Sequence, residues 1–118
     1  MEIRDEYERM DSGGMDADRL LRRLGASRKL TGFRYAEYMV EQVRADPERI
    51  RLITKRLYPD TGRTFRVTPG SVERDVRTLV QYCWARGDRA FFSRVACVPL
   101  RYPPSNSEFI DMLAAYLR

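Results

Sequence analysis

The spacing of apolar residues along the chain predicts helices, and this spacing is most regular between residues 69 and 86. In that segment an apolar stripe recurs at positions i, i+4, i+7, i+8 and i+11, and its members are Val72, Val76, Leu79, Val80 and Cys83. Thr68 is suited to cap a helix at its N-terminus, Pro69 to occupy the first helical position, and Gly87 to end the helix. We therefore expect a long helix over 69–86, with one face buried and the opposite face exposed.

Shorter helices are predicted on both sides of this long helix. Their expected ranges are 16–24, 33–44, 46–57, 60–66, one or two turns after residue 88, and 105–118. In the range 46–57 we expect Ile50, Ile53, Leu57 and Leu52 to point inward. The only candidate strand, 94–100, has no obvious partner. The prediction is an all-α fold of about six helices around a helix-turn-helix, arranged as an orthogonal helical bundle.

The start of the chain is expected to lie outside this bundle. Residues 2–10 can form a short helix, which Ser12-Gly13-Gly14 would then end. We expect residues 1–15 to be a flexible N-terminal extension and residues 16–118 to be one helix-turn-helix domain. A chain of 118 residues is long enough to bury a modest core.

Composition argues against several classes of function. Histidine is absent, and Cys83 and Cys97 do not form a CxxC pair, so we expect no metal site, no cofactor and no enzyme activity. No apolar run approaches the roughly 20 residues that a membrane span needs. Acidic residues near the start do not fit a secretory signal. The expected location is therefore the cytoplasm, without membrane contact.

The distribution of charge favours nucleic acid as a partner. The chain has 22 basic and 17 acidic residues, and only Lys29 and Lys55 among the basic residues are lysines. Residues 1–18 are net acidic, whereas 19–101 hold most of the arginines. The planar guanidinium of arginine suits phosphates and guanine edges, but a GC-rich genome explains the scarcity of lysine equally well. The uneven charge therefore points weakly to double-stranded DNA.

The exposed face of the helix over 69–86 has the properties of a helix that reads DNA. Gly70, Arg74, Arg77 and Gln81 lie opposite the apolar stripe, and Ser71 and Thr78 flank that face. Gly70 and Ser71 are small enough for close approach to a groove, and Arg74 can donate two bonds to O6 and N7 of guanine. An ordinary amphipathic helix with a solvated face has the same pattern, so the pattern alone leaves both interpretations open.

Further contacts to DNA are predicted beside this face. Glu73 can accept a bond from N4 of cytosine, or it can pair with Arg77 four residues later. Arg77, Thr78 and Gln81 suit phosphates, and so do the backbone N–H groups at the helix N-terminus. The complete set of candidate DNA-binding residues is Thr68, Gly70, Ser71, Glu73, Arg74, Arg77, Thr78, Gln81 and Lys55.

Several short stretches also carry a resemblance to a known family. They are Tyr58-Pro59-Asp60, Val72-Glu73-Arg74, Trp84-x-Arg86-Gly87 and Asn106-Ser107-Glu108-Phe109. The chain resembles, from about residue 20 to residue 118, the C-terminal effector domain of the stage-zero sporulation master regulator. That family consists of bacterial response regulators that bind promoters. The resemblance implies a sequence-specific transcription regulator in which Glu73 and Arg74 read bases and Arg77 follows one turn later.

The resemblance also implies partners. It implies contact with the sigma subunit of RNA polymerase through the segment 87–98, where Arg89 and Arg94 are the exposed candidates. The alternative is that Phe91, Phe92 and Val95 of this segment are simply core residues. The last helix resembles the element used when two domains sit side by side on DNA as a homodimer, although internal packing explains its apolar stripe equally well.

The chain departs from the family in two respects. Gly70-Ser71 replaces the Ser-Arg that usually precedes Val-Glu-Arg, so we expect weaker binding or a preferred site other than the family's short TGTCGAA-like box. Only about 15 residues precede the similar region, so we expect this chain to lack the family's receiver domain and its phosphorylation-driven dimerisation. Binding would then be constitutive, or switched by a partner or by concentration.

A second class of function competes with site-specific DNA binding. The chain can instead be a protein-interaction module, an antagonist or adaptor of a full-length regulator or of RNA polymerase, with weak or no specific DNA binding. Tight binding to such a partner, without DNA binding at low salt, would distinguish this function from the first.

Overall fold

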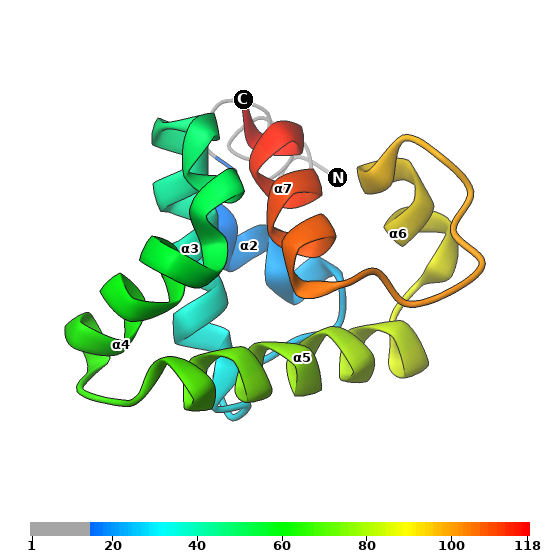
Figure 1. The fold of residues 1–118 in the computed structure, drawn as a ribbon. Coiled ribbons are helices and arrows are strands. Elements are labelled where there is room, and N and C mark those ends of the chain that lie inside the picture. Colours follow the sequence, from blue (N-terminus) through cyan, green and yellow to red (C-terminus); the bar gives the residue numbers. More distant parts are fainter. Residues whose placement is uncertain (1–14) are drawn as a thin grey trace.

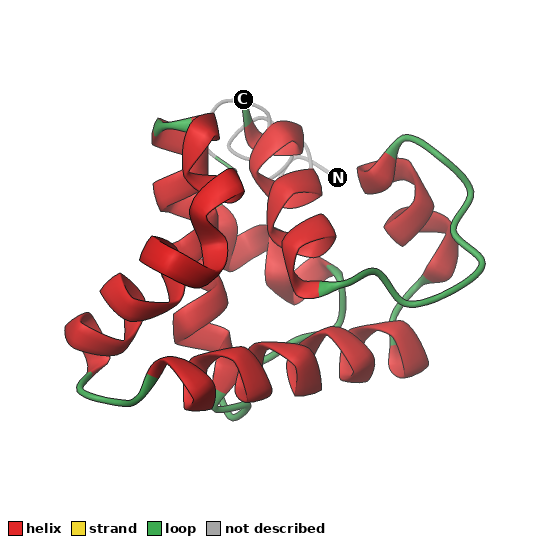
Figure 2. Ribbon diagram, in the orientation of Figure 1, coloured by secondary structure: helices red, strands yellow, loops and turns green. Residues whose placement is uncertain are grey.

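Helices make up most of residues 15–118, which is the part of the chain that the computed structural model describes, and no strand occurs in that part (Figure 2). The elements are α2 (Ala17–Arg23), α3 (Gly32–Ala45), η1 (Pro47–Leu52), η2 (Ile53–Leu57), α4 (Tyr58–Phe65), α5 (Pro69–Arg86), α6 (Arg89–Ala96) and α7 (Asn106–Leu117). The expected all-α class is confirmed. The segment 94–100, the only candidate strand, forms no strand, because α6 runs to Ala96 and a loop follows. The short helix predicted over 2–10 lies outside the described residues.

The long helix α5 lies along one edge of the molecule, and α3 and α7 stand across it (Figure 1). Helix α3 contacts both α5 and α7, and α4 leads into the start of α5. The core between these helices is aromatic and aliphatic, and its largest fully buried side chains include Phe33, Phe92, Phe109, Leu20, Met39 and Leu79. The apolar stripe predicted for α5 is buried along its whole length. This burial turns the opposite face of α5 away from the core.

Side chains cap the N-terminal ends of several predicted helices. The side chain of Asp16 accepts a bond from Arg19 N, that of Thr68 from Ser71 N, and that of Asp88 from Phe91 N. Ser105 and Glu108 form the reciprocal capping box. The N-terminal ends of α2, α5, α6 and α7 are therefore determined by residues next to each helix.

The prediction of one regular α-helix over 46–57 is wrong. The segment is a 3-10 helix, η1, followed by a π-helix, η2, and Leu52 at their junction has φ −112° and ψ 33°. Because the number of residues per turn changes at this junction, the inward direction shifts along the chain. Leu52, which was expected to point inward, is 43% exposed, whereas Ile50 and Ile53 pack partly against the core.

Two further helix ends differ from expectation. Helix α4 begins at Tyr58 rather than near residue 60, because η2 continues directly into it and Pro59 is tolerated in its first turn. Gly87 ends α5 in an extended conformation, with φ −85° and ψ 180°, and not in the left-handed one typical of a glycine cap. A Cβ at Gly87 would lie 2.3 Å from Leu24 O, so close backbone approach explains this glycine.

Glycine at position 32 permits contact between the backbones of α3 and α5. A Cβ added there would lie 2.2 Å from Asp75 O, so we expect Gly32→Ala to lower the free energy of unfolding by about 3 kcal/mol or more. Gly70→Ala is the matched control, because a Cβ at Gly70 meets nothing nearer than 4.0 Å and alanine favours the helix by roughly 0.5 kcal/mol. Urea denaturation followed by circular dichroism measures both. Equal stability of the two variants would contradict the close contact.

The two cysteines should differ in reactivity. Burial raises the pKa of the Cys83 thiol to about 12, so Cys83 stays protonated at every pH at which the fold is normally handled. Cys97 is exposed, and both thiols are free. We expect a disulfide reagent at pH 8 to modify Cys97 quickly and Cys83 only after denaturation. Fast modification of both thiols in the native protein would contradict the burial of Cys83.

Candidate nucleic-acid interface

The turn between α4 and α5 is closed by backbone contacts. Val67 N donates to Gly62 O at 2.9 Å, and a Cβ at Gly62 would lie 2.5 Å from Val67 O. Arg66 takes a left-handed conformation, with φ 60°, between these two residues. The ring of Phe65 packs against Tyr35 and Tyr38 of α3, with centroids 5.2 and 5.8 Å apart. The chain therefore forms a helix, a tight turn and a second helix, as the sequence predicts.

The outward face of α5 contains most of the predicted reading residues. Gly70, Arg74, Thr78 and Gln81 are exposed, and Ser71 is half-buried. The Arg74 side chain is 66% exposed, and its Nε lies 3.4 Å from Oδ1 of Asp75. This ion pair is exposed to solvent and contributes little stability, so the guanidinium can leave it at small cost. The space around Gly70 is open, so the first turn of α5 can approach a flat or grooved partner closely.

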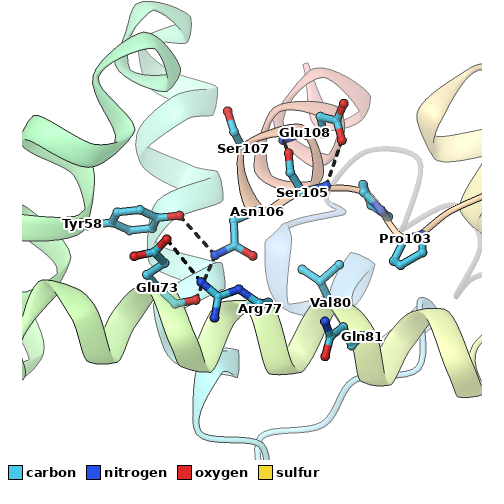
Figure 3. Close-up of a pocket in the computed structure, with 11 residues that line it drawn as sticks. Tyr58, Glu73, Arg77, Val80, Gln81, Pro103, Ser105, Asn106, Ser107 and Glu108 are labelled. Carbon is cyan, nitrogen blue, oxygen red and sulfur yellow. Dashed lines mark hydrogen bonds and ion pairs between the residues drawn. The ribbon is translucent and has the colours of Figure 1, made fainter.

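One flank of α5 faces the N-terminal end of α7 across a groove of about 560 Å³ (Figure 3). Glu73, Arg77 and Gln81 line the α5 side, and Ser105 to Glu108 line the other. Nη2 of Arg77 lies 3.3 Å from Oε2 of Glu73, so the predicted i, i+4 pair is present. Of the predicted DNA-binding residues, Glu73, Arg77 and Gln81 thus share this groove, whereas Arg74 and Thr78 do not line it.

Asn106 and Tyr58 belong to the same groove, and neither was predicted as a site residue. Nδ2 of Asn106 donates to Oη of Tyr58 at 3.1 Å and to the carbonyl of Glu73 at 2.9 Å. Burial raises the pKa of the Tyr58 hydroxyl, so this hydroxyl is neutral near pH 7. No pattern within a short stretch of sequence predicts these bonds, because the partners lie 48 and 33 positions from Asn106 in sequence.

Lys55 is separate from the face of α5. It is exposed in η2, before α4, and its ammonium group forms no ion pair with any residue in the described part of the chain. Arg63 pairs with Asp60 in α4, and Arg66 is exposed in the turn. Two basic side chains therefore lie on the helix-turn-helix ahead of α5, and Lys55 lies one element earlier.

The segment 87–98 combines a buried apolar side with exposed arginines. Phe91, Phe92 and Val95 are buried, which confirms that they are core residues. The guanidinium of Arg89 lies 4.1 Å from the centroid of Trp84, and Nε of Arg89 donates to Trp84 O at 2.9 Å. Arg94 lies 5.3 Å from the ring of Phe91. Neither arginine has an acidic partner within residues 15–118.

The described residues contain no group of three or more Cys, Asp or Glu side chains placed to hold a metal ion. Their helices also include none that combines the length and the apolarity of a membrane-crossing segment.

Comparison with protein families shows which family the chain matches. The family described as "Sporulation initiation factor Spo0A C terminal" matches residues 17–117, which is nearly the whole chain. The chain belongs to this family. The family consists of DNA-binding domains of sporulation transcription factors and not of enzymes. Its all-α fold and its binding of DNA agree with the helix-turn-helix and with the exposed face of α5.

Arg66 occupies a backbone conformation that favours glycine. A residue with a Cβ costs roughly 1–2 kcal/mol in the left-handed conformation, and glycine avoids this cost. Part of that gain is lost, because glycine has more conformational freedom in the unfolded chain. We expect Arg66→Gly to raise the free energy of unfolding by about 0.5–1 kcal/mol. Arg63→Gly, inside α4, is the control and should lower it by about 1 kcal/mol. Thermal denaturation compares them, and destabilisation by both would argue against a left-handed turn.

Proposed function

We propose that this protein is a sequence-specific, DNA-binding transcription regulator of the sporulation effector type, with α5 as its recognition helix in the major groove. The observation that carries the proposal is the outward face of α5. It presents an exposed arginine, Arg74, one turn after an open N-terminus at Gly70, while the opposite face is fully buried. A helix that enters the major groove needs this combination of a packed face and a slim, hydrogen-bonding face. Such a regulator acts in the cytoplasm, at the chromosome.

Base reading is assigned to the start of α5. Arg74 donates to O6 and N7 of guanine, and Glu73 either accepts from cytosine N4 or orients Arg77. Ser71 and Gly70 permit close approach, and the Ser71 hydroxyl lies 3.0 Å from that of Thr68. Thr78 and Gln81 are placed later on the helix, where contacts to phosphates are expected.

Affinity is assigned to phosphate contacts around the reading face. Arg63 and Arg66 lie on the first helix and the turn, and Lys55 precedes them. The first N–H groups of α5 add a partial positive charge, because the helix N-terminus leaves them without helical partners. The position before Val72 holds serine where the family usually has arginine, so we infer weaker binding to the family's box than the family pattern would give.

A second candidate function is supported by the segment 87–98. Arg89 and Arg94 are held against aromatic rings and have no acidic partner among the described residues, so they suit an acidic protein surface. The sigma subunit of RNA polymerase is the partner that the family resemblance suggests. An adaptor that binds polymerase or a full-length regulator, with little specific DNA binding, would use this surface in place of α5. A homodimer on DNA through α7, where Tyr116 is 40% exposed, also belongs to the proposal.

Fluorescence anisotropy tests the reading role of Arg74. One duplex carries the family's TGTCGAA-like box and the other a scrambled sequence, and both are titrated at several salt concentrations. We expect Arg74→Ala to reduce the preference for the box by about 1–3 kcal/mol, which is the usual discrimination of one bidentate base contact.

Arg51→Ala is the matched control. It removes the same charge from an exposed arginine of η1 that pairs with Glu48, and it should leave the preference unchanged. Equal binding of both duplexes by the wild-type protein, lost as salt rises, would mean that only phosphates are contacted. That result, together with retained binding to RNA polymerase, would favour the adaptor function.

A further inference from the structure

Asn106 differs from the other buried polar residue of the described chain. Thr61 and Asn106 are the buried polar side chains of residues 15–118, apart from the aromatic ones. The hydroxyl of Thr61 donates to Leu57 O, one turn earlier in the same helical segment. The amide of Asn106, which is 9% exposed, instead bonds to two other helices. Asn106 thus joins elements that are distant in sequence.

The two bonds of Asn106 reach both helices of the helix-turn-helix. One hydrogen of Nδ2 goes to Tyr58, the first residue of α4, at 3.1 Å. The other goes to the carbonyl of Glu73 in α5 at 2.9 Å. Both hydrogens of the amide nitrogen are therefore used, and Figure 3 shows the amide between the Tyr58 ring and the α5 backbone.

The capping box holds the residues on either side of Asn106. Ser105 N donates to Oε1 of Glu108 at 2.8 Å, and Glu108 N donates to Oγ of Ser105 at 3.1 Å. Pro104, just before this capping box, is buried. The amide therefore projects from a rigid support, and its bonds constrain α4 and α5 more than a mobile side chain would.

Apolar packing alone leaves part of the position of α5 undetermined. The buried stripe of α5 resists removal from the core, but hydrophobic contact has no preferred direction and tolerates small slides and rotations. A hydrogen bond weakens steeply with misalignment, so the bond at Glu73 restricts such movements beside the reading residues. We propose that Asn106 is a positioning residue, which holds the first turns of α5 so that Glu73 and Arg74 meet bases in one geometry. The inference rests on the proposed function of α5.

The test compares Asn106→Ala and Tyr58→Phe with Ser107→Ala as the control. Ser107 lines the same groove but takes no part in the bonds to α4 and α5. We expect Asn106→Ala to lower the ratio of affinities for specific and scrambled duplexes roughly tenfold, because Arg74 is then less well aligned. Binding to the scrambled duplex and its salt dependence should not change, because no cation is removed. Tyr58→Phe removes one of the two bonds and should give a smaller loss.

Hydrogen exchange in the free protein supplies a readout that does not depend on DNA. In Asn106→Ala we expect the amides of residues 72–77 to exchange faster relative to those of α3, which report opening of the whole core. An unchanged affinity ratio in the folded variant would overturn the inference. With faster relative exchange Asn106 would hold α5 without any effect on base reading, and with unchanged exchange it would not hold α5 at all. If Asn106→Ala does not fold, Tyr58→Phe decides by the same two measurements.

The two measurements also distinguish a failure of this inference from a failure of the proposed function. If the wild-type protein binds every duplex alike, the proposed reading role fails, and exchange alone then decides whether Asn106 holds α5. Faster exchange in residues 72–77 would then support the hold of Asn106 on α5, and unchanged exchange would overturn it.

Discussion

The placement of the N-terminal half of α5 depends on two points where one backbone meets another without room for a side chain between them. At Gly32 the start of α3 touches the carbonyl of Asp75, and at Gly62 helix α4 touches the carbonyl of Val67. The first contact sets the distance between α3 and α5, and the second sets the tight turn that precedes α5. The apolar stripe decides which face of α5 turns inward, and these two approaches decide how closely its N-terminal half lies against α3 and α4.

Apolar burial and hydrogen bonds contribute differently to the position of α5. The stripe of α5 supplies most of the attraction to the core, since burial of apolar area is favourable whatever its orientation. The amide of Asn106 adds bonds whose strength depends on angle and distance. A DNA-binding helix needs both, because affinity tolerates small displacements, whereas recognition of a base edge requires donors and acceptors at matched positions.

Local sequence signals predicted most of the fold. Thr68, Asp88 and the capping box of Ser105 each act within four residues of themselves, so the sequence alone located the helices that they start. The outward face of α5 followed from the period of its apolar residues. The family resemblance then suggested which of its residues read bases.

The remaining features arise from contacts that no short segment contains. The 3-10 and π winding of 47–57 exposes Leu52, and an apolar period that assumes regular helix geometry cannot anticipate this change. The extended conformation of Gly87 reflects the approach of Leu24 from another helix. The bonds of Asn106 to Tyr58 and Glu73 likewise join residues far apart in sequence, so only the folded chain shows that these side chains meet.

The ion pair between Glu73 and Arg77 has a consequence for how the protein treats DNA in general. While the two side chains stay together, this flank of α5 carries no net charge, and an approaching phosphate must compete with a carboxylate already beside Arg77. Random DNA therefore gains less from this flank than an unpaired Arg77 would provide. Under the proposed function, a smaller attraction to all sequences leaves a larger share of the protein for the preferred site, so the Glu73 carboxylate would contribute to selectivity by weakening non-specific binding.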